Sequence, residues 1–265
     1  TVIDSKRGTS SATNNPFISL KSKNTTEKNG EIYGFSLVYS GNFSTIVEVD
    51  QNDVTRVNMG INHFDFNWNL KENESFQTPE IIMVYSSDGI NGMSQTFHNI
   101  FNNNIIRGKY KNRSRSVLIN NWEATYFDFD EEKILSLARK AKALGVEMFV
   151  LDDGWFGTRN DDFQGLGDWY VNMEKLPNGI SGLSKKINDL GMKFGLWFEP
   201  EMANKNSDLY RAHPDWILSA PGRYDTSSRN QHVLDFSRSE VVDYIYESVS
   251  KILRDANIEY IKWDM

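Results

Sequence analysis

The stretch Ile258-Glu259-Tyr260-Ile261-Lys262-Trp263-Asp264-Met265 is a short, mostly apolar segment that carries one carboxylate at its C-terminal tip, flanked by a lysine and a tryptophan. Such a segment is typical of a buried β-strand. In a parallel α/β barrel the reacting groups lie just after the strands, whereas a carboxylate in the middle of a buried strand is costly. The stretch therefore favours a parallel α/β fold and makes Asp264 a candidate nucleophile.

The alternation of strand and helix extends back to Ser116. Apolar runs expected to form strands lie at residues 117–122, 147–151, 193–198, 232–236 and 258–263. Helical patterns separate them: one ends at Gly145, another at Gly191, and a capping box at residues 237–240 begins a third. Five consecutive units predict that residues 111–265 form the first part of a (β/α)8 TIM barrel, truncated after about its fifth strand. A doubly wound sheet is the alternative, disfavoured because no glycine-rich phosphate loop follows the first strand.

Residues 1–110 have the pattern of an all-β module. The β-rich runs at residues 31–39, 45–49, 55–61, 64–70 and 81–85 are separated by turn signals. Lys28-Asn29-Gly30 is a hairpin turn signal, because Asn and Gly tolerate positive φ. The pattern predicts part of a β-sandwich that supports the following domain, or one that itself binds carbohydrate.

Composition limits the classes of partner. The net charge of −7 argues against nucleic acid or a membrane surface, because both reward clustered Lys and Arg. No apolar run approaches the roughly 20 residues of a transmembrane helix. The absence of cysteine fits a cytoplasmic protein. Because the chain begins at Thr1 without a methionine, an upstream signal peptide is the alternative.

Polar and aromatic residues follow the predicted strands, and the carboxyl ends of parallel strands meet at one edge of a sheet. They include Trp122, Asp152, Asp153, Trp197, Glu199, Lys262 and Asp264. Tryptophan faces suit stacking against sugars, although core packing is the alternative for each ring. A glycosidic bond is cleaved by two carboxyl groups on opposite sides of the anomeric carbon. The sequence thus favours a sugar-binding site at the strand ends, in which Asp264 is one of the two catalytic carboxyl groups.

The adjacent pair Asp152 and Asp153 cannot point the same way. One is expected to accept hydrogen bonds from a ligand while the other anchors the loop, and simple loop capping is the alternative. A Mg²⁺ or Mn²⁺ site at such strand ends is a further alternative, but the four histidines show no ligand spacing. We therefore expect neither metal nor cofactor. Lys262 should point to the same side as Asp264 and favour its ionised form, or it should bind a ligand hydroxyl.

Five motifs at the predicted strand exits carry a resemblance to a known family. They are Asn121-Trp122-Glu123-Ala124, Leu151-Asp152-Asp153-Gly154-Trp155, Leu196-Trp197-Phe198-Glu199-Pro200-Glu201, Arg229-Asn230-Gln231 with Leu234-Asp235, and Lys262-Trp263-Asp264-Met265. Together they resemble glycoside hydrolase family 36, the bacterial α-galactosidases. Arg7-Gly8-Thr9-Ser10-Ser11, Asn15-Pro16-Phe17 and Tyr33-Gly34-Phe35-Ser36 look like the end of that family's N-terminal β-sandwich domain.

The resemblance implies a retaining exo-α-galactosidase that removes terminal galactose from oligosaccharides of the raffinose and melibiose type. It implies Asp264 as the nucleophile, and it places the general acid/base on a later strand beyond residue 265. The remaining implied roles are Asp152 and Asp153 binding O4 and O6 of galactose, Trp122 and Trp197 forming aromatic walls, and Arg229 and Lys262 lining the pocket. A homo-oligomer is also implied. A raffinose-synthase-type galactosyl transferase and a non-catalytic carbohydrate-binding fragment are the alternatives.

Overall fold

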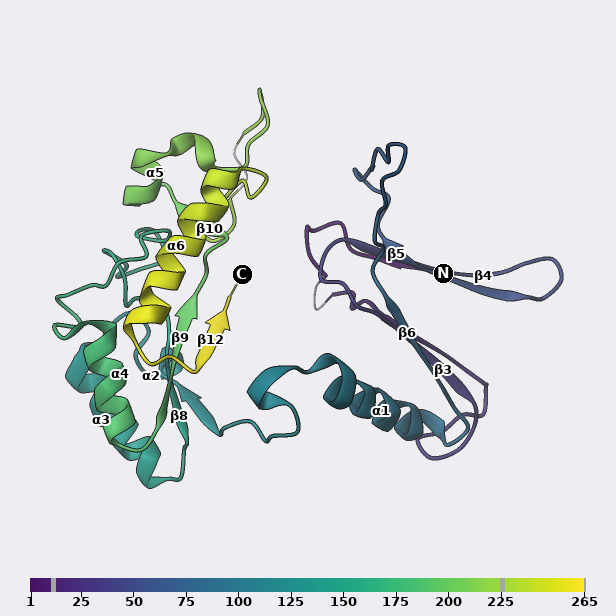
Figure 1. Ribbon diagram of the computed structural model, residues 1–265, viewed down its shortest axis with the longest axis horizontal. Helices are drawn as coiled ribbons and strands as arrows, with labels where there is room; N and C mark the ends of the chain where they lie inside the picture. The colour runs from purple at the N-terminus through teal and green to yellow at the C-terminus, as the bar shows by residue number, and fades with distance from the viewer. Residues whose placement is uncertain (11–12, 225–226, 265) are drawn as a thin grey trace. The chain divides into compact units, whose positions relative to one another are not determined.

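The structure is a computed structural model that describes residues 1–10, 13–224 and 227–264. Ser11 and Met265, which belong to motifs quoted above, lie outside the described residues. The chain divides into two compact units, Thr1–Ser114 and Arg115–Met265. Each unit has its own sheets and helices (Figure 1).

Two antiparallel three-stranded sheets form the Thr1–Ser114 unit. One has the order β1-β4-β5, and the other has the order β2-β3-β6. The strands are β1 (Val2–Asp4), β2 (Phe17–Lys21), β3 (Ile32–Leu37), β4 (Phe43–Val49), β5 (Thr55–Ile61) and β6 (Ile81–Ser86). Residues 64–70, expected to be a strand, are turn and irregular structure, and Asp65 has a φ of 49° there. Their aromatic residues form a local cluster instead, in which the rings of Trp68 and Phe76 are 4.8 Å apart.

The sequence pattern predicts an all-β module for residues 1–110, but the first unit also contains helices. Helix α1 (Gly89–Ile100) follows β6 and continues into a π-helical segment (Phe101–Ile105) and a short 3-10 helix (Gly108–Tyr110). Met93 and Phe97, four residues apart on α1, are buried with Ile32 and Val84 of the second sheet. The helix therefore covers a face that β-strands alone would leave open.

A four-stranded parallel sheet forms the centre of the Arg115–Met265 unit. Its order is β12-β9-β8-β7, which places successive strands side by side. The strands are β7 (Leu118–Asn120), β8 (Met148–Leu151), β9 (Lys193–Phe198) and β12 (Tyr260–Trp263). Helices α3 (Glu131–Ala143), α4 (Gly179–Asp189) and α6 (Ser239–Asp255) connect them and lie on one face of the sheet (Figure 1). This is the winding of a β/α barrel, and β8 and β9 are almost wholly buried, as central parallel strands are.

One expected barrel strand, at residues 232–236, is not part of this sheet. Strand β11 (Gln231–Val233) pairs antiparallel with β10 (Met202–Asn204) in a separate two-stranded sheet. The physical reason is visible in the burial pattern: Leu234 is buried whereas Val233 and Phe236 are exposed, so the run covers one face only. A parallel barrel strand is buried on both faces. The described residues therefore contain four parallel strands rather than the expected five.

The helix boundaries follow local chemistry. Asp130 caps α3 by accepting a hydrogen bond from the backbone N–H of Lys133 at 2.8 Å. Gly145 and Gly191, with φ of 87° and 73°, follow the ends of α3 and α4. The capping box expected at residues 237–240 does not form, because α6 begins at Ser239 and Ser237 bonds Asp235 instead. Two short helices, α2 (Trp122–Thr125) and α5 (Asp208–Ala212), and the 3-10 turn Pro214–Trp216 complete the unit.

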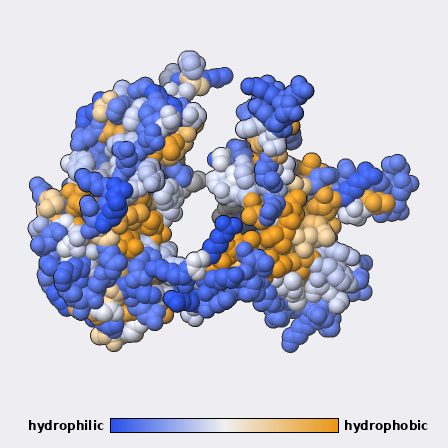
Figure 2. Space-filling view, in the orientation of Figure 1, coloured by the Kyte–Doolittle hydropathy of each residue, from blue (hydrophilic) through white to orange (hydrophobic). Residues whose placement is uncertain are grey.

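Apolar side chains reach the surface in both units, as Figure 2 shows. In the second unit they include Leu118 and Ile119 of β7 and Tyr260 of β12, the two outermost strands of the sheet. In the described part of the chain, no helix has the length and apolar character needed to cross a bilayer.

Candidate active site at the ends of the parallel strands

The parallel strands bring a set of carboxylates to one edge of the sheet. Asp152 follows β8, Glu199 follows β9 and Asp264 follows β12. Because β12, β9 and β8 are neighbours in parallel register, these three tips point the same way along the sheet. The edge is the one at which barrel enzymes place their chemistry.

Asp264 is held by strand β9. Its backbone N–H donates to the carbonyl of Phe198 at 2.8 Å, and its Oδ2 accepts a hydrogen bond from the indole Nε1 of Trp197 at 3.1 Å. Trp197 is only 1% exposed and stacks on Phe156, with 5° between the ring planes. The ring therefore orients the carboxylate. It offers no open face in the described structure, so its implied role as an aromatic wall stays a prediction.

Asp152 is buried and fully engaged. Its Oδ2 accepts a hydrogen bond from Nζ of Lys262 at 2.8 Å and another from the side-chain amide of Asn120, while its Oδ1 accepts from the backbone N–H of Asp153 at 2.9 Å. Lys262 was expected to favour the ionised form of Asp264 or to bind a ligand hydroxyl. Its hydrogen bond goes to Asp152 because β12 and β8 flank β9, and the long lysine side chain spans that gap.

Asp153 serves the loop that follows β8. The guanidinium of Arg159 binds it with two nitrogens, Nε to Oδ1 at 3.1 Å and Nη2 to Oδ2 at 2.8 Å. Arg159 is fully buried and also donates to Oδ1 of Asn204 at 3.0 Å. Burial raises the pKa of Asp153, although Arg159 acts in the opposite direction. Asp153 is thus the aspartate that anchors the loop, whereas ligand binding by the other aspartate stays a prediction.

Sequence reasoning missed Arg159 as part of this site. It lies in a long polar loop without regular periodicity, and no motif marks it. The one available signal was chemical: a buried aspartate pair after a barrel strand requires a cation, because an uncompensated buried charge is costly.

Glu199 is the least compensated acid at this edge. It is fully buried, and its Oε2 accepts a hydrogen bond from Nε2 of Gln231 at 2.9 Å. Its Oε1 has no hydrogen-bond partner among the described residues. Burial is the main cause that raises the pKa of Glu199 to about 7, with Asp264 adding to the rise and Arg229 opposing it.

Two further expected residues lie at the rim. Trp122 is half-buried on α2 and packs edge-on against Tyr126 and Phe127, with ring centroids 5.2 and 5.1 Å away. Arg229 has a side chain that is 57% exposed, and its Nη2 lies 4.0 Å from Oε2 of Glu199. The structure therefore joins Arg229 to the carboxylate edge through Glu199, whereas the ring contacts of Trp122 are with its own helix and loop.

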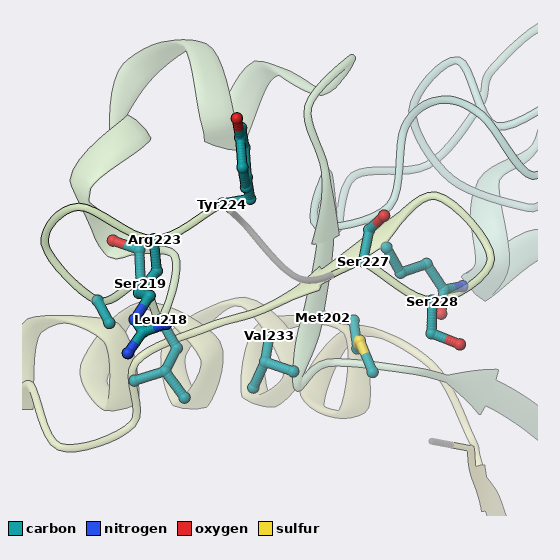
Figure 3. A pocket seen from close by; sticks show the side chains of 10 residues that line it. Met202, Leu218, Ser219, Arg223, Tyr224, Ser227, Ser228 and Val233 are labelled. Atoms are coloured by element: carbon teal, nitrogen blue, oxygen red, sulfur yellow. The ribbon is translucent and has the colours of Figure 1, made fainter.

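A cavity of about 610 Å³ lies beside this edge. Met202 of β10 and Val233 of β11 line one side and Tyr224 stands across from them (Figure 3). Gln231, which bonds Glu199, also lines the cavity. In the described ranges, no three His, Asp or Glu side chains come together in a way that could hold a metal ion, so no metal ligands are assigned.

The fold and site define the class of protein as one with a barrel-type α/β unit whose strand edge is lined with carboxylates, an arrangement that suits glycoside hydrolysis. Residues 75–265 match the Melibiase family, and residues 1–71 match the glycosyl hydrolase family 36 N-terminal domain. The chain belongs to the Melibiase family. The resemblance drawn from the sequence motifs is thereby confirmed.

Characterised relatives are similar along the whole chain. Alpha-galactosidase AgaA of Geobacillus stearothermophilus is 59% identical over 262 residues, and alpha-galactosidase Mel36A of Lactobacillus acidophilus is 54% identical over 264 residues. These matches cover 99% and 100% of this chain but 36% of each relative, so the chain spans about a third of their length. A crystal structure of an AgaA variant in complex with raffinose superposes with a TM-score of 0.96 at 58% identity, covering 100% of this chain and 37% of that one.

Proposed function

We propose that the protein containing this chain is a retaining exo-α-galactosidase that releases terminal α-linked galactose from oligosaccharides such as raffinose and melibiose. The observation that carries the proposal is Asp264 at the tip of β12, oriented by the Trp197 indole N–H and close to the Asp152–Lys262 ion pair. The relatives named alpha-galactosidase support the choice of sugar, because variants of one of them, AgaA, have been solved with raffinose and with stachyose.

In the proposed reaction, an oxygen of the Asp264 carboxylate forms a bond to C1 of galactose as the bond from C1 to the leaving-group oxygen breaks. A second carboxyl group protonates that oxygen. Water, deprotonated by the same group, then attacks C1 and releases Asp264 and galactose with retained configuration. No residue of this chain is assigned as the acid/base, which the family resemblance places on a later strand.

The remaining site residues are proposed to read the sugar. Asp152 and Lys262, paired at 2.8 Å, would exchange part of their mutual hydrogen bonding for the galactose hydroxyls, and Asp153 would hold the loop or share that role. Arg229 would close the rim over the sugar, and Trp122 and Trp197 would supply aromatic surface. The position of Asp152, Lys262 and Asp264 at one strand edge supports the polar assignments, and the two aromatic roles rest on the family resemblance.

We further propose that residues 1–110 are the C-terminal part of a β-sandwich domain and that residues 111–265 open the catalytic TIM barrel. The remaining barrel strands would then be supplied beyond this chain. The absence of cysteine supports a cytoplasmic location, and a homo-oligomer is expected from the resemblance.

The proposal is tested by trapping the nucleophile. An α-galactoside with a 2-fluoro group and an activated leaving group needs little acid catalysis, so it should esterify Asp264 even where the acid/base is missing. Peptide mapping by mass spectrometry should find the label on Asp264, both in the full-length protein and in any chain that builds the site. A label on another residue would refute the assignment. Product that forms only when an acceptor sugar is added would favour a galactosyl transferase.

A second measurement concerns this chain by itself. Because the acid/base is expected outside it, the isolated 265-residue chain should hydrolyse raffinose poorly or not at all. Efficient raffinose hydrolysis by the isolated chain would show that the acid/base lies within these residues.

A further inference from the structure

Glu199 is a buried carboxylate that the proposed reaction does not use. It is neither the residue that would attack C1 nor one of the aspartates after β8. Its side chain is 1% exposed, and one of its two oxygens lacks a hydrogen-bond partner among the described residues. A neutral glutamine or an apolar residue would fill this volume at lower cost, so the burial of an acid here requires another explanation.

The side-chain hydrogen bond and the ion pair of Glu199 both lead to one turn. Ser228 and Gln231 exchange backbone hydrogen bonds at 3.2 and 2.9 Å, which makes residues 228–231 a tight turn. Its two central residues, Arg229 and Asn230, have φ of 52° and 62°, a left-handed conformation that an arginine adopts only under constraint. Glu199 supplies part of that constraint, because it binds Gln231 directly and attracts Arg229 at 4.0 Å.

The turn is also fixed from a second side. Nδ2 of Asn204, on β10, donates to the carbonyl of Asn230 at 2.8 Å. Asn204 is itself bound to Arg159, which holds Asp153. The turn that carries Arg229 is therefore tied to the same buried network as the aspartates after β8, and Glu199 is the acid in that network that faces the arginine.

We propose that ionised Glu199 is a positioning residue that holds Arg229 and the 228–231 turn against the galactose site, and that its protonation releases them and weakens sugar binding. The proposal rests on the proposed function, because it assigns to Arg229 the task of contacting the sugar. It makes affinity for galactose depend on pH through a group that does not touch the sugar.

Besides burial, charged groups from three segments act on the protonation of Glu199. Asp264 from the end of β12 and Asp153 from the loop after β8 repel its negative charge, whereas Arg229 from the turn and Arg159 from the β8 loop favour it. Burial outweighs the two arginines and places the pKa of Glu199 near 7. The ionised form, which attracts Arg229, therefore predominates at pH 8 and is lost as the pH falls below 7.

The test measures galactose binding by calorimetry on the full-length protein between pH 5.5 and 8.5. Galactose carries no titrating group in this range, so any pH dependence belongs to the protein. The parent should lose affinity as the pH falls through about 7. Glu199→Gln, which keeps the shape and can still bond Gln231, should bind galactose about tenfold more weakly at pH 8 than the parent, as expected for one lost charge contact near a protein surface. Its affinity should no longer change across this range.

A matched control is Glu131→Gln, another buried glutamate, which lies at the start of α3 and pairs with Lys186. It should lower thermal stability yet keep the parent's affinity and pH profile. Arg229→Gln should weaken binding as Glu199→Gln does, and the double variant should be no weaker than either alone. The inference would be overturned if the two substitutions weakened galactose binding by factors that multiply in the double variant. It would also be overturned if the galactose affinity of Glu199→Gln changed with pH as the parent's does. If the parent neither binds galactose nor labels at Asp264, the proposed function itself fails, and the inference with it.

Discussion

At the residue scale, the buried charges decide how this edge of the sheet is built. Asp153, Arg159 and Glu199 are each almost or fully buried, yet only the first two neutralise each other. A paired buried charge contributes to a defined loop geometry, whereas a poorly paired one lowers stability and is retained for another purpose. The two cases lead to opposite expectations for substitution.

Replacing Arg159 should be strongly destabilising. Arg159→Met leaves Asp153 buried without its bidentate partner, which costs on the order of 3–5 kcal/mol. Adding Asp153→Asn should recover much of the loss, because the uncompensated charge is then gone. Thermal or denaturant unfolding would measure both effects. As a control, Lys185→Met breaks the exposed pair with Asp189 and should change stability by about 0.5 kcal/mol or less. Equal losses of stability in Arg159→Met and Lys185→Met would contradict the assignment.

Replacing Glu199 should stabilise the protein at alkaline pH. Its pKa is raised from 4.5 to about 7, so the folded state binds the proton more tightly than the unfolded chain. Ionisation of Glu199 therefore does not lower the free energy of unfolding below pH 4.5. The loss grows as the pH rises from 4.5 to 7 and is constant above pH 7. Glu199→Gln should gain up to about 3 kcal/mol at pH 8 and little near pH 4.5. Unfolding curves across this range would check the trend, and a variant less stable than the parent at pH 8 would contradict it.

At the element scale, helix ends and strand partners account for most of the architecture. Helix α3 begins where Asp130 can cap it and has Glu131 and Glu132 in its first turn, which complements the helix dipole. These signals are local, and a reading of the sequence finds them. The run at residues 232–236 is different: its apolar residues fit a barrel strand, but it is buried on one face only, and β11 pairs antiparallel with β10.

The cap of α3 can be tested directly. Asp130→Ala removes the acceptor for the Lys133 N–H and should cost about 1 kcal/mol of stability. Asp130→Ser, which keeps a capping oxygen, should be nearly neutral. Unfolding monitored by circular dichroism would compare the two, and an alanine variant as stable as the serine variant would show that the cap contributes nothing.

At the scale of the whole molecule, the parallel sheet has two outer strands. Each of β7 and β12 pairs with a neighbour on one side only, and each exposes apolar residues such as Ile119 and Tyr260. Open strand edges next to apolar surface favour association between chains. The proposed longer barrel would cover these edges.

The 265-residue chain expressed alone should therefore aggregate. We expect high light scattering and strong binding of a hydrophobic dye, both of which should fall in a protein extended to complete the barrel. A monodisperse monomer of the isolated chain would show that the outer strands are protected by other means.

Much of the site could be read from the sequence, because barrel chemistry follows strand ends and strand ends are marked by apolar runs. Asp152, Asp153, Glu199 and Asp264 were found in this way. Their different partners could not be read from the sequence. Arg159, which binds Asp153, lies in a loop without periodicity, and Gln231 reaches Glu199 only through the antiparallel pairing of β11 with β10.

The sequence by itself determined the four parallel strands and the helices α3, α4 and α6 of the second unit, the strand-end carboxylates and the family, because all of these rest on local periodicity and short motifs. Only the tertiary structure decided that residues 232–236 leave the barrel sheet, that Lys262 pairs with Asp152, and that Trp197 orients Asp264. The physical reason is that burial, pairing and charge compensation are relations between distant segments. A side chain's partners are fixed only when the strands are placed side by side.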